Sequence, residues 1–175
     1  MIIGNFIKGI ELKHRNHYFS DINFNSSKCK KDNIFFAIKG AKTDGNKFIK
    51  QAIQKGANTI ISNQKFEGIK KNVLFIKSSN VRKSLSEFAY SIYKNKPRNI
   101  TAVTGTNGKS SIVDFYFQIL SLNKKKVASI GTLGVKTQNY IKKVSNTTVD
   151  PITLSTTLNK IKKEKINNVI LEASS

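Results

Sequence analysis

A glycine-rich loop between an apolar strand and a helix constrains this chain more than any other feature. The loop reads Thr104-Gly105-Thr106-Asn107-Gly108-Lys109-Ser110. The apolar strand Ile100–Thr104 leads into it, and Ser110–Leu122 continues with a helical pattern. Glycines let the backbone turn tightly and direct N–H groups at phosphate oxygens, and the N-terminus of the helix adds a favourable dipole. The segment therefore predicts a phosphate-binding loop.

The last two residues of this loop have separate predicted roles. Lys109 would neutralise phosphate charge and is the candidate catalytic residue, while the Ser110 hydroxyl would ligate Mg²⁺. The spacing G-x-x-G-K-S is two residues shorter than the common Walker form, because Val103 stands where its first glycine would be. A glycine turn that only joins a strand to a helix would not explain Lys109 and Ser110 together. The predicted nucleotide-binding residues are Gly105, Thr106, Asn107, Gly108, Lys109, Ser110 and Ser111.

Strand and helix patterns alternate on both sides of a polar, basic linker, Lys94–Asn99, which contains Pro97. Before it we expect strands at 33–38, 59–62 and 73–76 and helices at 48–55 and 81–93. After it we expect strands at 100–104, 127–130 and 168–172 and helices at 110–122 and 152–163. Such alternation predicts mostly parallel sheets with crossover helices.

The fold class predicted is therefore α/β, with a small N-terminal α/β domain over residues 1–96 and a parallel-sheet ATPase domain over residues 97–175. Since the chain stops directly after a strand, we expect the second domain to be truncated. No run of 18 apolar residues is present, so the sequence predicts a cytoplasmic protein without a membrane segment.

The net charge of +21 raises the question of nucleic-acid binding. Lysines are spread over nearly every segment, and no aromatic and basic stacking motif accompanies them, which favours solvated lysine faces without a specific nucleic-acid partner. The single cysteine, Cys29, can form neither an internal disulfide nor a thiolate metal site and is expected to be an ordinary small side chain. His14 and His17 are expected to be surface residues without a role.

The loop and three later segments resemble the Mur ligase family. T-G-T-N-G-K-S after a short apolar strand is the form that the loop takes in this family. Ile130–Gly134 resembles the I-G-T-x-G segment of the diamino-acid-adding MurE branch, and Asn146–Pro151 resembles its N-T-T-x-[DE]-P loop. Leu171–Ser175 is similar to the E-x-S-S strand end, whose acidic residue helps to hold Mg²⁺ in the family. The resemblance implies that Glu172 joins Ser110 as a metal ligand.

The N-terminal half carries the resemblance further. Asp32–Ala37 is similar to the family's G-D-x-F-x-A segment, and Gly40–Gly45 is similar to its G-x-x-x-D-G turn. Asn25-Ser26-Ser27 stands where the family has D-S-R, so the aspartate and the arginine are replaced while Ser26 is retained. These segments bind uridine diphosphate in the family. The substrate-binding residues implied are Ser26, Gly40, Lys42, Thr43, Asn146, Thr147, Thr148 and Ser174.

The resemblance implies ATP-dependent, Mg²⁺-dependent ligation of a diamino acid, meso-diaminopimelate or lysine, to a UDP-N-acetylmuramoyl dipeptide, by a monomer. The diamino-acid site would lie outside this chain, which alone is expected to be inactive. The alternatives are the branch that adds D-alanyl-D-alanine and a noncatalytic nucleotide- or polyanion-binding module. Single segments also have plainer interpretations: Asn146–Thr148 as a turn and helix cap, Glu172 as a surface carboxylate, and Gly40–Gly45 as a hairpin turn.

Overall fold

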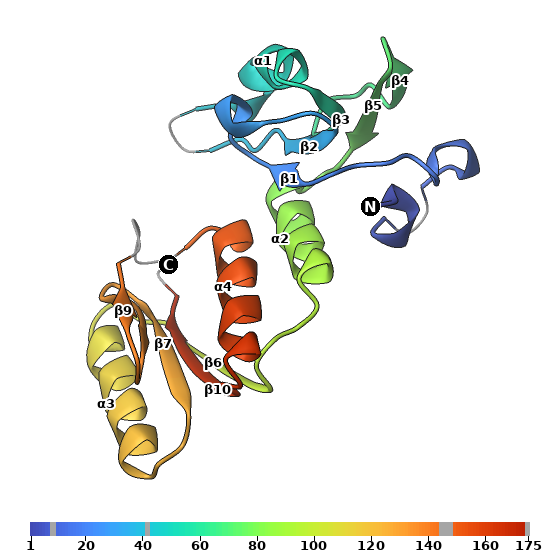
Figure 1. Ribbon diagram of the computed structural model, residues 1–175. Coiled ribbons are helices and arrows are strands. Elements are labelled where there is room, and N and C mark those ends of the chain that lie inside the picture. Colours follow the sequence, from blue (N-terminus) through green and yellow to red (C-terminus); the bar gives the residue numbers. More distant parts are fainter. Residues whose placement is uncertain (8–9, 41–42, 144–148, 174–175) are drawn as a thin grey trace. The chain divides into compact units, whose positions relative to one another are not determined.

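The computed structural model describes residues 1–7, 10–40, 43–143 and 149–173, and the chain forms two compact units, Met1–Ser91 and Ile92–Ser175 (Figure 1). Each unit is a parallel-rich sheet flanked by helices, which confirms the predicted α/β class. Residues 93–98 contain neither helix nor strand. None of the helices in the described ranges combines the length and apolarity needed to span a bilayer.

The first unit is built on a five-stranded sheet in the order β1-β2-β3-β5-β4. All neighbouring pairs are parallel except β4 with β5. The strands are β1 (Ile22–Asn23), β2 (Asn33–Phe36), β3 (Ala57–Ser62), β4 (Gly68–Lys70) and β5 (Val73–Lys77), and the helices are α1 (Ile49–Gln54) and α2 (Val81–Ile92). Short 3-10 helices add the turns Ile3–Asn5, Leu12–His14, Ser26–Lys28 and Gly45–Phe48.

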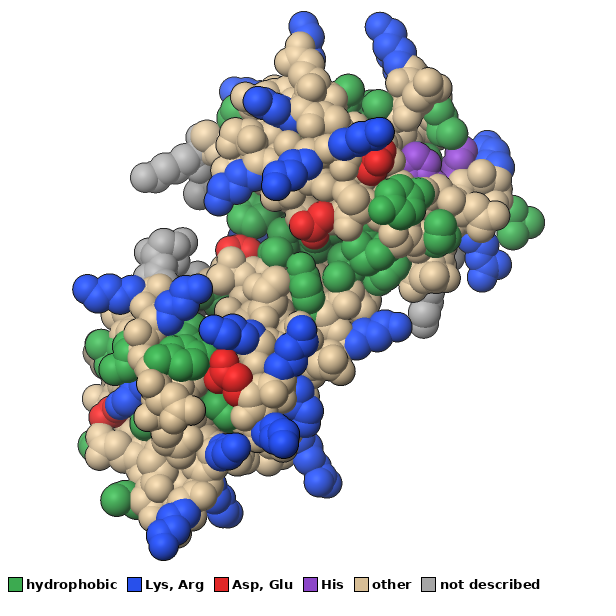
Figure 2. Space-filling view, viewed as in Figure 1, with side chains coloured by type: hydrophobic (Ala, Val, Ile, Leu, Met, Phe, Trp, Pro, Cys, Tyr) green, Lys and Arg blue, Asp and Glu red, His purple; other side chains and the backbone are tan. Residues whose placement is uncertain are grey.

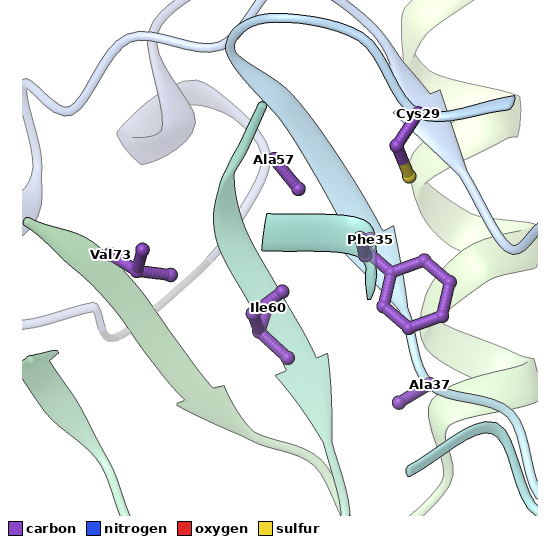
Figure 3. Close-up of a cluster of buried hydrophobic side chains, with 7 residues drawn as sticks. Cys29, Phe35, Ala37, Ala57, Ile60 and Val73 are labelled. Atoms are coloured by element: carbon purple, nitrogen blue, oxygen red, sulfur yellow. The ribbon is translucent and has the colours of Figure 1, made fainter. Parts of the chain in front are cut away.

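Successive residues of β2 point to opposite faces of this sheet, and each face has its own core. Phe35 lies in a cluster with Ala52 of α1 and with Cys29, Ala37, Ala57, Ile60 and Val73 (Figure 3). Phe36 faces the other way, where its ring centroid is 5.4 Å from that of Phe88 in α2. Both faces of the central strands are therefore buried, as expected for parallel strands between helices.

Two residues outside the predicted site test the expectations for this unit. Cys29 is a buried core side chain, as expected, and burial raises the pKa of its thiol to about 11. His14, by contrast, is only 7% exposed, and its Nε2 atom has no hydrogen-bond partner in the described part of the chain. The expectation that His14 is a surface residue is wrong, because the turn Leu12–His14 directs the imidazole inward while Leu12 remains 83% exposed.

The second unit has a five-stranded sheet in the order β6-β10-β7-β8-β9. The strands are β6 (Asn99–Val103), β7 (Val127–Gly131), β8 (Gly134–Thr137), β9 (Ile141–Lys142) and β10 (Asn168–Glu172); the helices are α3 (Lys109–Leu122) and α4 (Pro151–Lys163). β6, β10 and β7 are parallel, and β8 and β9 add an antiparallel extension. Leu158 and Ile161 of α4 are buried in a cluster with Ile130 and Val169, and Val113 and Phe117 are the buried residues of α3.

Candidate functional site

The glycine-rich loop joins β6 to α3, as the sequence predicts. Gly108 precedes the helix in the left-handed region (φ 77°), and Gly105 also has a positive φ (146°). No heavy atom lies within 4 Å of a Cβ built on Gly108. Glycine is therefore favoured there by its backbone conformation rather than by lack of space.

The N-terminus of α3 differs from those of the other long helices. Asp150 caps α4 by accepting hydrogen bonds from the amides of Ile152 and Thr153, both at 3.0 Å, and Asn80 accepts one from Lys83 at the start of α2. At α3 the capping position is Gly108, which makes no side-chain capping bond. The first-turn amides of α3 are thus available to an exogenous acceptor, and an anion is the ligand that a helix N-terminus favours.

Lys109 provides the positive charge of this loop. Its Nζ donates hydrogen bonds to the carbonyl oxygens of Gly105 (2.5 Å) and Thr106 (3.1 Å). The ammonium group is therefore held over the loop backbone and close to the uncapped helix end. Ser110 and Ser111 follow in the first turn and are both exposed. An ammonium group, glycine amides and a helix N-terminus together form an arrangement suited to the phosphates of a nucleotide.

Ser110 and Glu172 line the same small cavity, although 62 positions separate them in the sequence. Glu172 is the last residue of β10 and pairs with Val103 at the end of β6, directly before the loop. The cavity measures about 10 Å³, comparable with the volume that one water-sized sphere occupies. The two predicted metal ligands are thus brought together beside the loop.

The carboxylate of Glu172 is held in a fixed orientation. Its Oε2 accepts hydrogen bonds from the amide (3.2 Å) and the hydroxyl (2.7 Å) of Thr132, and the residue is only 4% exposed. A surface carboxylate, the plainer interpretation of Glu172, is therefore wrong. Gly131 makes this placement possible, because a Cβ there would lie 2.6 Å from Cδ of Glu172.

The residues present fit Mg²⁺ bound together with a nucleotide. The described part of the chain contains no group of three or more His, Cys, Asp and Glu side chains that could enclose a metal. Mg²⁺, however, usually takes one or two protein carboxylates together with water and substrate phosphates. Glu172 and Ser110 supply such a partial set of oxygen ligands.

The sequence did not indicate a second charged pair that lines this cavity. Lys136 of β8 donates to Oδ1 of Asp114 at 3.0 Å, and its Nζ lies 4.4 Å from the ring centroid of Phe117. The Lys136 hydrogen bond, followed by that of Gln118, lowers the pKa of Asp114. The available signal was the i,i+4 spacing of Ser110 and Asp114, which places both on one face of α3.

In the first unit, Ser26 lies on a 3-10 turn that follows β1. It is 6% exposed, and its hydroxyl donates to Oε1 of Gln51 in α1 at 2.6 Å. Asn25, which replaces the family's aspartate, accepts hydrogen bonds from the amide and the hydroxyl of Ser27. The turn therefore keeps its cap despite the substitution, and the Ser26 hydroxyl can offer only its lone pairs to a ligand while the bond to Gln51 is in place.

The Gly40–Gly45 segment is closed by backbone hydrogen bonds after β2. The amide of Gly40 donates to the Thr43 carbonyl (2.8 Å), and that of Gly45 donates to the Ile38 carbonyl (2.9 Å). A Cβ on Gly45 would lie 2.6 Å from Ile38 backbone atoms, so the turn requires glycine there. Thr43 is exposed at this turn. These bonds agree with the plainer interpretation of this segment, a turn.

Five predicted substrate-binding residues lie outside the described residues: Lys42, Asn146, Thr147, Thr148 and Ser174. Their neighbour Asp150 is the N-cap of α4, with Pro151 at the first helical position. The cap of this helix is therefore Asp150 rather than a residue of the Asn146–Thr148 segment.

Family models support the class that the loop and fold define. The model described as "Mur ligase middle domain" matches residues 103–175, and the model described as "Mur ligase family, catalytic domain" matches residues 19–98. The chain carries the N-terminal and middle domains of a Mur ligase and belongs to that family.

Curated relatives of this chain share one name, UDP-N-acetylmuramoyl-L-alanyl-D-glutamate--2,6-diaminopimelate ligase. The protein of Rickettsia montanensis is 40% identical over 163 residues, which is 91% of this chain and 34% of the relative. That of Buchnera aphidicola subsp. Schizaphis graminum is 35% identical over 165 residues, 90% of this chain and 33% of the relative. The chain thus spans about a third of the length of the curated relatives it matches.

Solved structures show the same fold. A structure of a UDP-N-acetylmuramoyl-L-alanyl-D-glutamate--2,6-diaminopimelate ligase has a TM-score of 0.80 at 24% identity and covers 99% of this chain and 35% of its own. MurF ligase from Thermotoga maritima in complex with ADP has a TM-score of 0.56 at 21% identity, covering 88% of this chain and 32% of its own.

Proposed function

We propose that this chain supplies the substrate-binding and part of the nucleotide-binding machinery of an ATP-dependent ligase that adds a diamino acid to UDP-N-acetylmuramoyl-L-alanyl-D-glutamate in peptidoglycan synthesis. The observation that carries the proposal is the uncapped N-terminus of α3 beneath Lys109, with Ser110 and Glu172 around one small cavity. The relatives' names favour 2,6-diaminopimelate over lysine as the amino acid.

The reaction joins a carboxylate to an amine. ATP transfers its γ-phosphate to the D-glutamate carboxylate, and the amine then displaces phosphate from this acyl phosphate. The protein has little covalent work to do, so its contribution is to position two anions and offset their repulsion. In the proposal, the amides of Thr106–Lys109 hold the phosphates and Lys109 stabilises the charge that develops during transfer.

Mg²⁺ would be held by Ser110 and Glu172, and it would neutralise phosphate charge when bound. Thr132 keeps Oε2 of Glu172 oriented, and Oε1 has no hydrogen-bond partner among the described residues. The carboxylate therefore has one oxygen left for a cation.

Residues 1–96 serve in this proposal as the domain that holds the uridine diphosphate part, with Ser26, Gly40, Lys42 and Thr43 as contacts. Asn146, Thr147, Thr148 and Ser174 would contact the substrate from the second domain, residues 97–175. Binding at the nucleotide end of the substrate then helps to orient the reacting carboxylate at the other end.

The two alternatives have less support. The structure of the diaminopimelate-adding ligase matches this chain with a TM-score of 0.80, whereas the MurF structures reach only 0.55 and 0.56. A polyanion-binding module would require concentrated positive charge. Figure 2 shows Lys and Arg side chains scattered over both units on the visible face rather than gathered into one patch.

Calorimetry on the 175-residue chain tests the proposal directly. We expect it to bind ATP in a Mg²⁺-dependent manner and UDP-N-acetylmuramoyl dipeptide without Mg²⁺, and to release no ADP when both substrates and diaminopimelate are present. The complete protein should release ADP only with all three. The proposal would be overturned if the chain bound neither ATP nor UDP-N-acetylmuramoyl dipeptide. Tight sequence-selective binding to DNA or RNA at physiological salt would also overturn it.

A further inference from the structure

The small cavity beside the glycine-rich loop contains more charged groups than the proposed metal ligands. Its lining includes the Ser110 hydroxyl, the carboxylates of Asp114 and Glu172, and the ammonium group of Lys136. Two carboxylates and a hydroxyl are the kind of oxygen ligands that suit Mg²⁺ and Mn²⁺. A positively charged ammonium group in the same cavity opposes the entry of such an ion.

Two residues of α3 hold Lys136 in this cavity. Its Nζ donates a hydrogen bond to Oδ1 of Asp114 at 3.0 Å, and it lies 4.4 Å from the ring centroid of Phe117, whose face attracts a cation. The side chain of Lys136 is 26% exposed and that of Asp114 is 34% exposed, so salt and water screen the pair only in part. The ammonium group therefore has a defined position in the cavity.

This ion pair also occupies an oxygen that Asp114 could offer to a metal. Oδ1 accepts from Lys136, and Oδ2 accepts from Nε2 of Gln118, one turn further along α3. In Glu172, Thr132 donates to Oε2, while Oε1 has no hydrogen-bond partner in the ranges that the structure describes. The pair thus leaves Glu172 as the carboxylate with the more available oxygen.

We propose that Lys136 acts as an internal counter-ion that prevents this cavity from binding a divalent cation in the absence of nucleotide. The inference rests on the proposed function and deepens it, because it names the residue that makes metal binding depend on the nucleotide phosphates. Two carboxylates alone would balance the charge of one divalent ion, but the ammonium group already neutralises one of them. Phosphate oxygens supply both the missing negative charge and further ligands, which is how proteins usually bind Mg²⁺.

Removal of the ammonium group should therefore create a site that needs no nucleotide. Lys136→Met keeps an apolar chain against Phe117 but removes the charge and the donor, so Oδ1 of Asp114 loses its partner. That oxygen can then join Ser110 and Glu172 as a cation ligand. We expect Lys136→Met to bind Mn²⁺ at least about tenfold more tightly than wild type, because an adjacent positive charge repels a divalent ion strongly in a partly buried site.

Titration of the 175-residue chain with Mn²⁺ alone, followed by electron paramagnetic resonance of the free ion, tests this inference. Lys136→Arg keeps the positive charge and should bind Mn²⁺ as weakly as wild type. Lys142→Met is the matched control: it removes an exposed lysine from β9, the neighbour of β8, and Lys142 is not among the described residues that line the cavity. This control should stay within about twofold of wild type, as expected for an exposed and screened charge.

Two double variants locate the bound ion. Adding either Asp114→Asn or Glu172→Gln to Lys136→Met removes one carboxylate ligand, and each should abolish the gain in Mn²⁺ affinity. A purely structural ion pair would instead predict some loss of stability in Lys136→Met and no change in Mn²⁺ binding. The pair is partly exposed, so the fold should persist without it. Lys136→Gln, which is also neutral, repeats the measurement if the methionine variant does not fold.

The outcomes separate this inference from the proposed function. If Lys136→Met gains no Mn²⁺ affinity, or if Lys136→Arg or Lys142→Met gains as much, the inference is wrong, and Mg²⁺-dependent binding of ATP to wild type decides the proposed function separately. The inference is also wrong if wild type binds Mn²⁺ alone as tightly as Lys136→Met does. If Lys136→Met gains affinity while wild type binds no ATP, Lys136 stands as the counter-ion of a cation site and the proposed function fails.

Discussion

The two units share an architecture but differ in how completely their sheets are covered. In the first unit, every residue of β2 is buried, and so are all residues of β3 except Asn58. In the second, β6 is exposed over Asn99–Ala102, and α3 leaves Ile112, Phe115, Ile119 and Leu122 between 52% and 82% exposed. The first unit has therefore withdrawn more of its apolar surface from water, and we expect it to be the more stable of the two.

The candidate sites of the two units also rest on differently covered strands. In the first unit, the candidate binding residues lie on turns attached to a sheet that is packed on both faces. In the second, the glycine-rich loop follows β6, of which Asn99–Ala102 are exposed, and Glu172 on the adjacent β10 is fixed by Thr132. By mass action, a ligand stabilises the unit that binds it by an amount set by the ligand concentration relative to its Kd, whatever the unit's own stability, so ATP should raise the stability of the second unit and leave that of the first unchanged.

Core truncation should show the largest contrast between the units. Phe88 is 4% exposed and its ring packs against those of Phe6, Phe19 and Phe36, so Phe88→Ala should lower the free energy of unfolding by about 3–5 kcal/mol. Phe115 in α3 is 62% exposed, so Phe115→Ala should change the free energy of unfolding by less than about 0.5 kcal/mol. Urea unfolding of both variants measures these two changes in the free energy of unfolding. Similar losses in the two variants would contradict the claim that the first unit buries its apolar side chains more completely.

Loss of the loop lysine should produce the next largest effect, on turnover rather than on stability. In the complete ligase, Lys109→Ala should reduce turnover by about 10²–10³, because a preorganised charge at the transferring phosphate is lost. Binding of UDP-N-acetylmuramoyl dipeptide should not change. Lys125→Ala removes an exposed lysine after the same helix and serves as the control. Normal ATP use by Lys109→Ala would require withdrawal of this assignment.

Replacement of the candidate metal carboxylate should weaken the Mg²⁺ dependence of nucleotide binding. Glu172→Gln preserves the shape of the side chain but removes its charge, so ATP affinity in the presence of Mg²⁺ should fall by about tenfold, the equivalent of one charged contact. Affinity in the presence of a chelator should be unaffected. Asp114→Asn, at the other carboxylate of the same cavity, is the comparison. If the two variants respond alike, Glu172 has no special role.

Much of the fold of the two units could be predicted from the sequence, because long apolar patterns determine the main helices and strands. α2 and α3, expected at 81–93 and 110–122, occur at Val81–Ile92 and Lys109–Leu122. The missed strands are short and lack such a pattern: β1 and β9 have two residues each, β4 has three, and β8 has four. They exist because a neighbouring strand offers free backbone groups, which no local sequence signal encodes.

The candidate site likewise has a part that the sequence predicts and a part that it does not. The glycine-rich loop could be predicted, because its glycines, lysine and serine lie close together in the sequence at a spacing typical of phosphate binding. Lys136 and Asp114 could not, because their contact depends on how β8 returns beside β7. The burial of His14 was likewise not indicated by the sequence pattern around it.

The hydroxyl assigned to substrate binding in the first unit should have a smaller effect. Ser26→Ala should weaken UDP-N-acetylmuramoyl dipeptide by on the order of 1 kcal/mol, about one hydrogen bond, and leave ATP binding unchanged. Ser27→Ala is the matched control, since Ser27 is exposed and, among the described residues, its amide and hydroxyl bond to Asn25 alone. Calorimetry of both ligands with both variants measures these affinities. If Ser26→Ala binds the substrate as tightly as wild type, the Ser26 hydroxyl has a structural role through its bond to Gln51 and no role in substrate binding.

The smallest expected effect concerns the pH dependence of the Asp114–Lys136 pair. The Lys136 hydrogen bond lowers the pKa of Asp114 in the folded state, so the pair stabilises the fold at pH values above the unfolded pKa of about 3.9. This contribution is lost as the pH falls through the lower, folded pKa. Because about a third of the Asp114 side chain is exposed, water screens the pair, and Asp114→Asn should cost less than about 1 kcal/mol at pH 7. Urea unfolding of wild type and variant between pH 7 and pH 2 should show their difference shrinking toward zero in acid; a difference that grows as the pH falls would show that the sign is wrong.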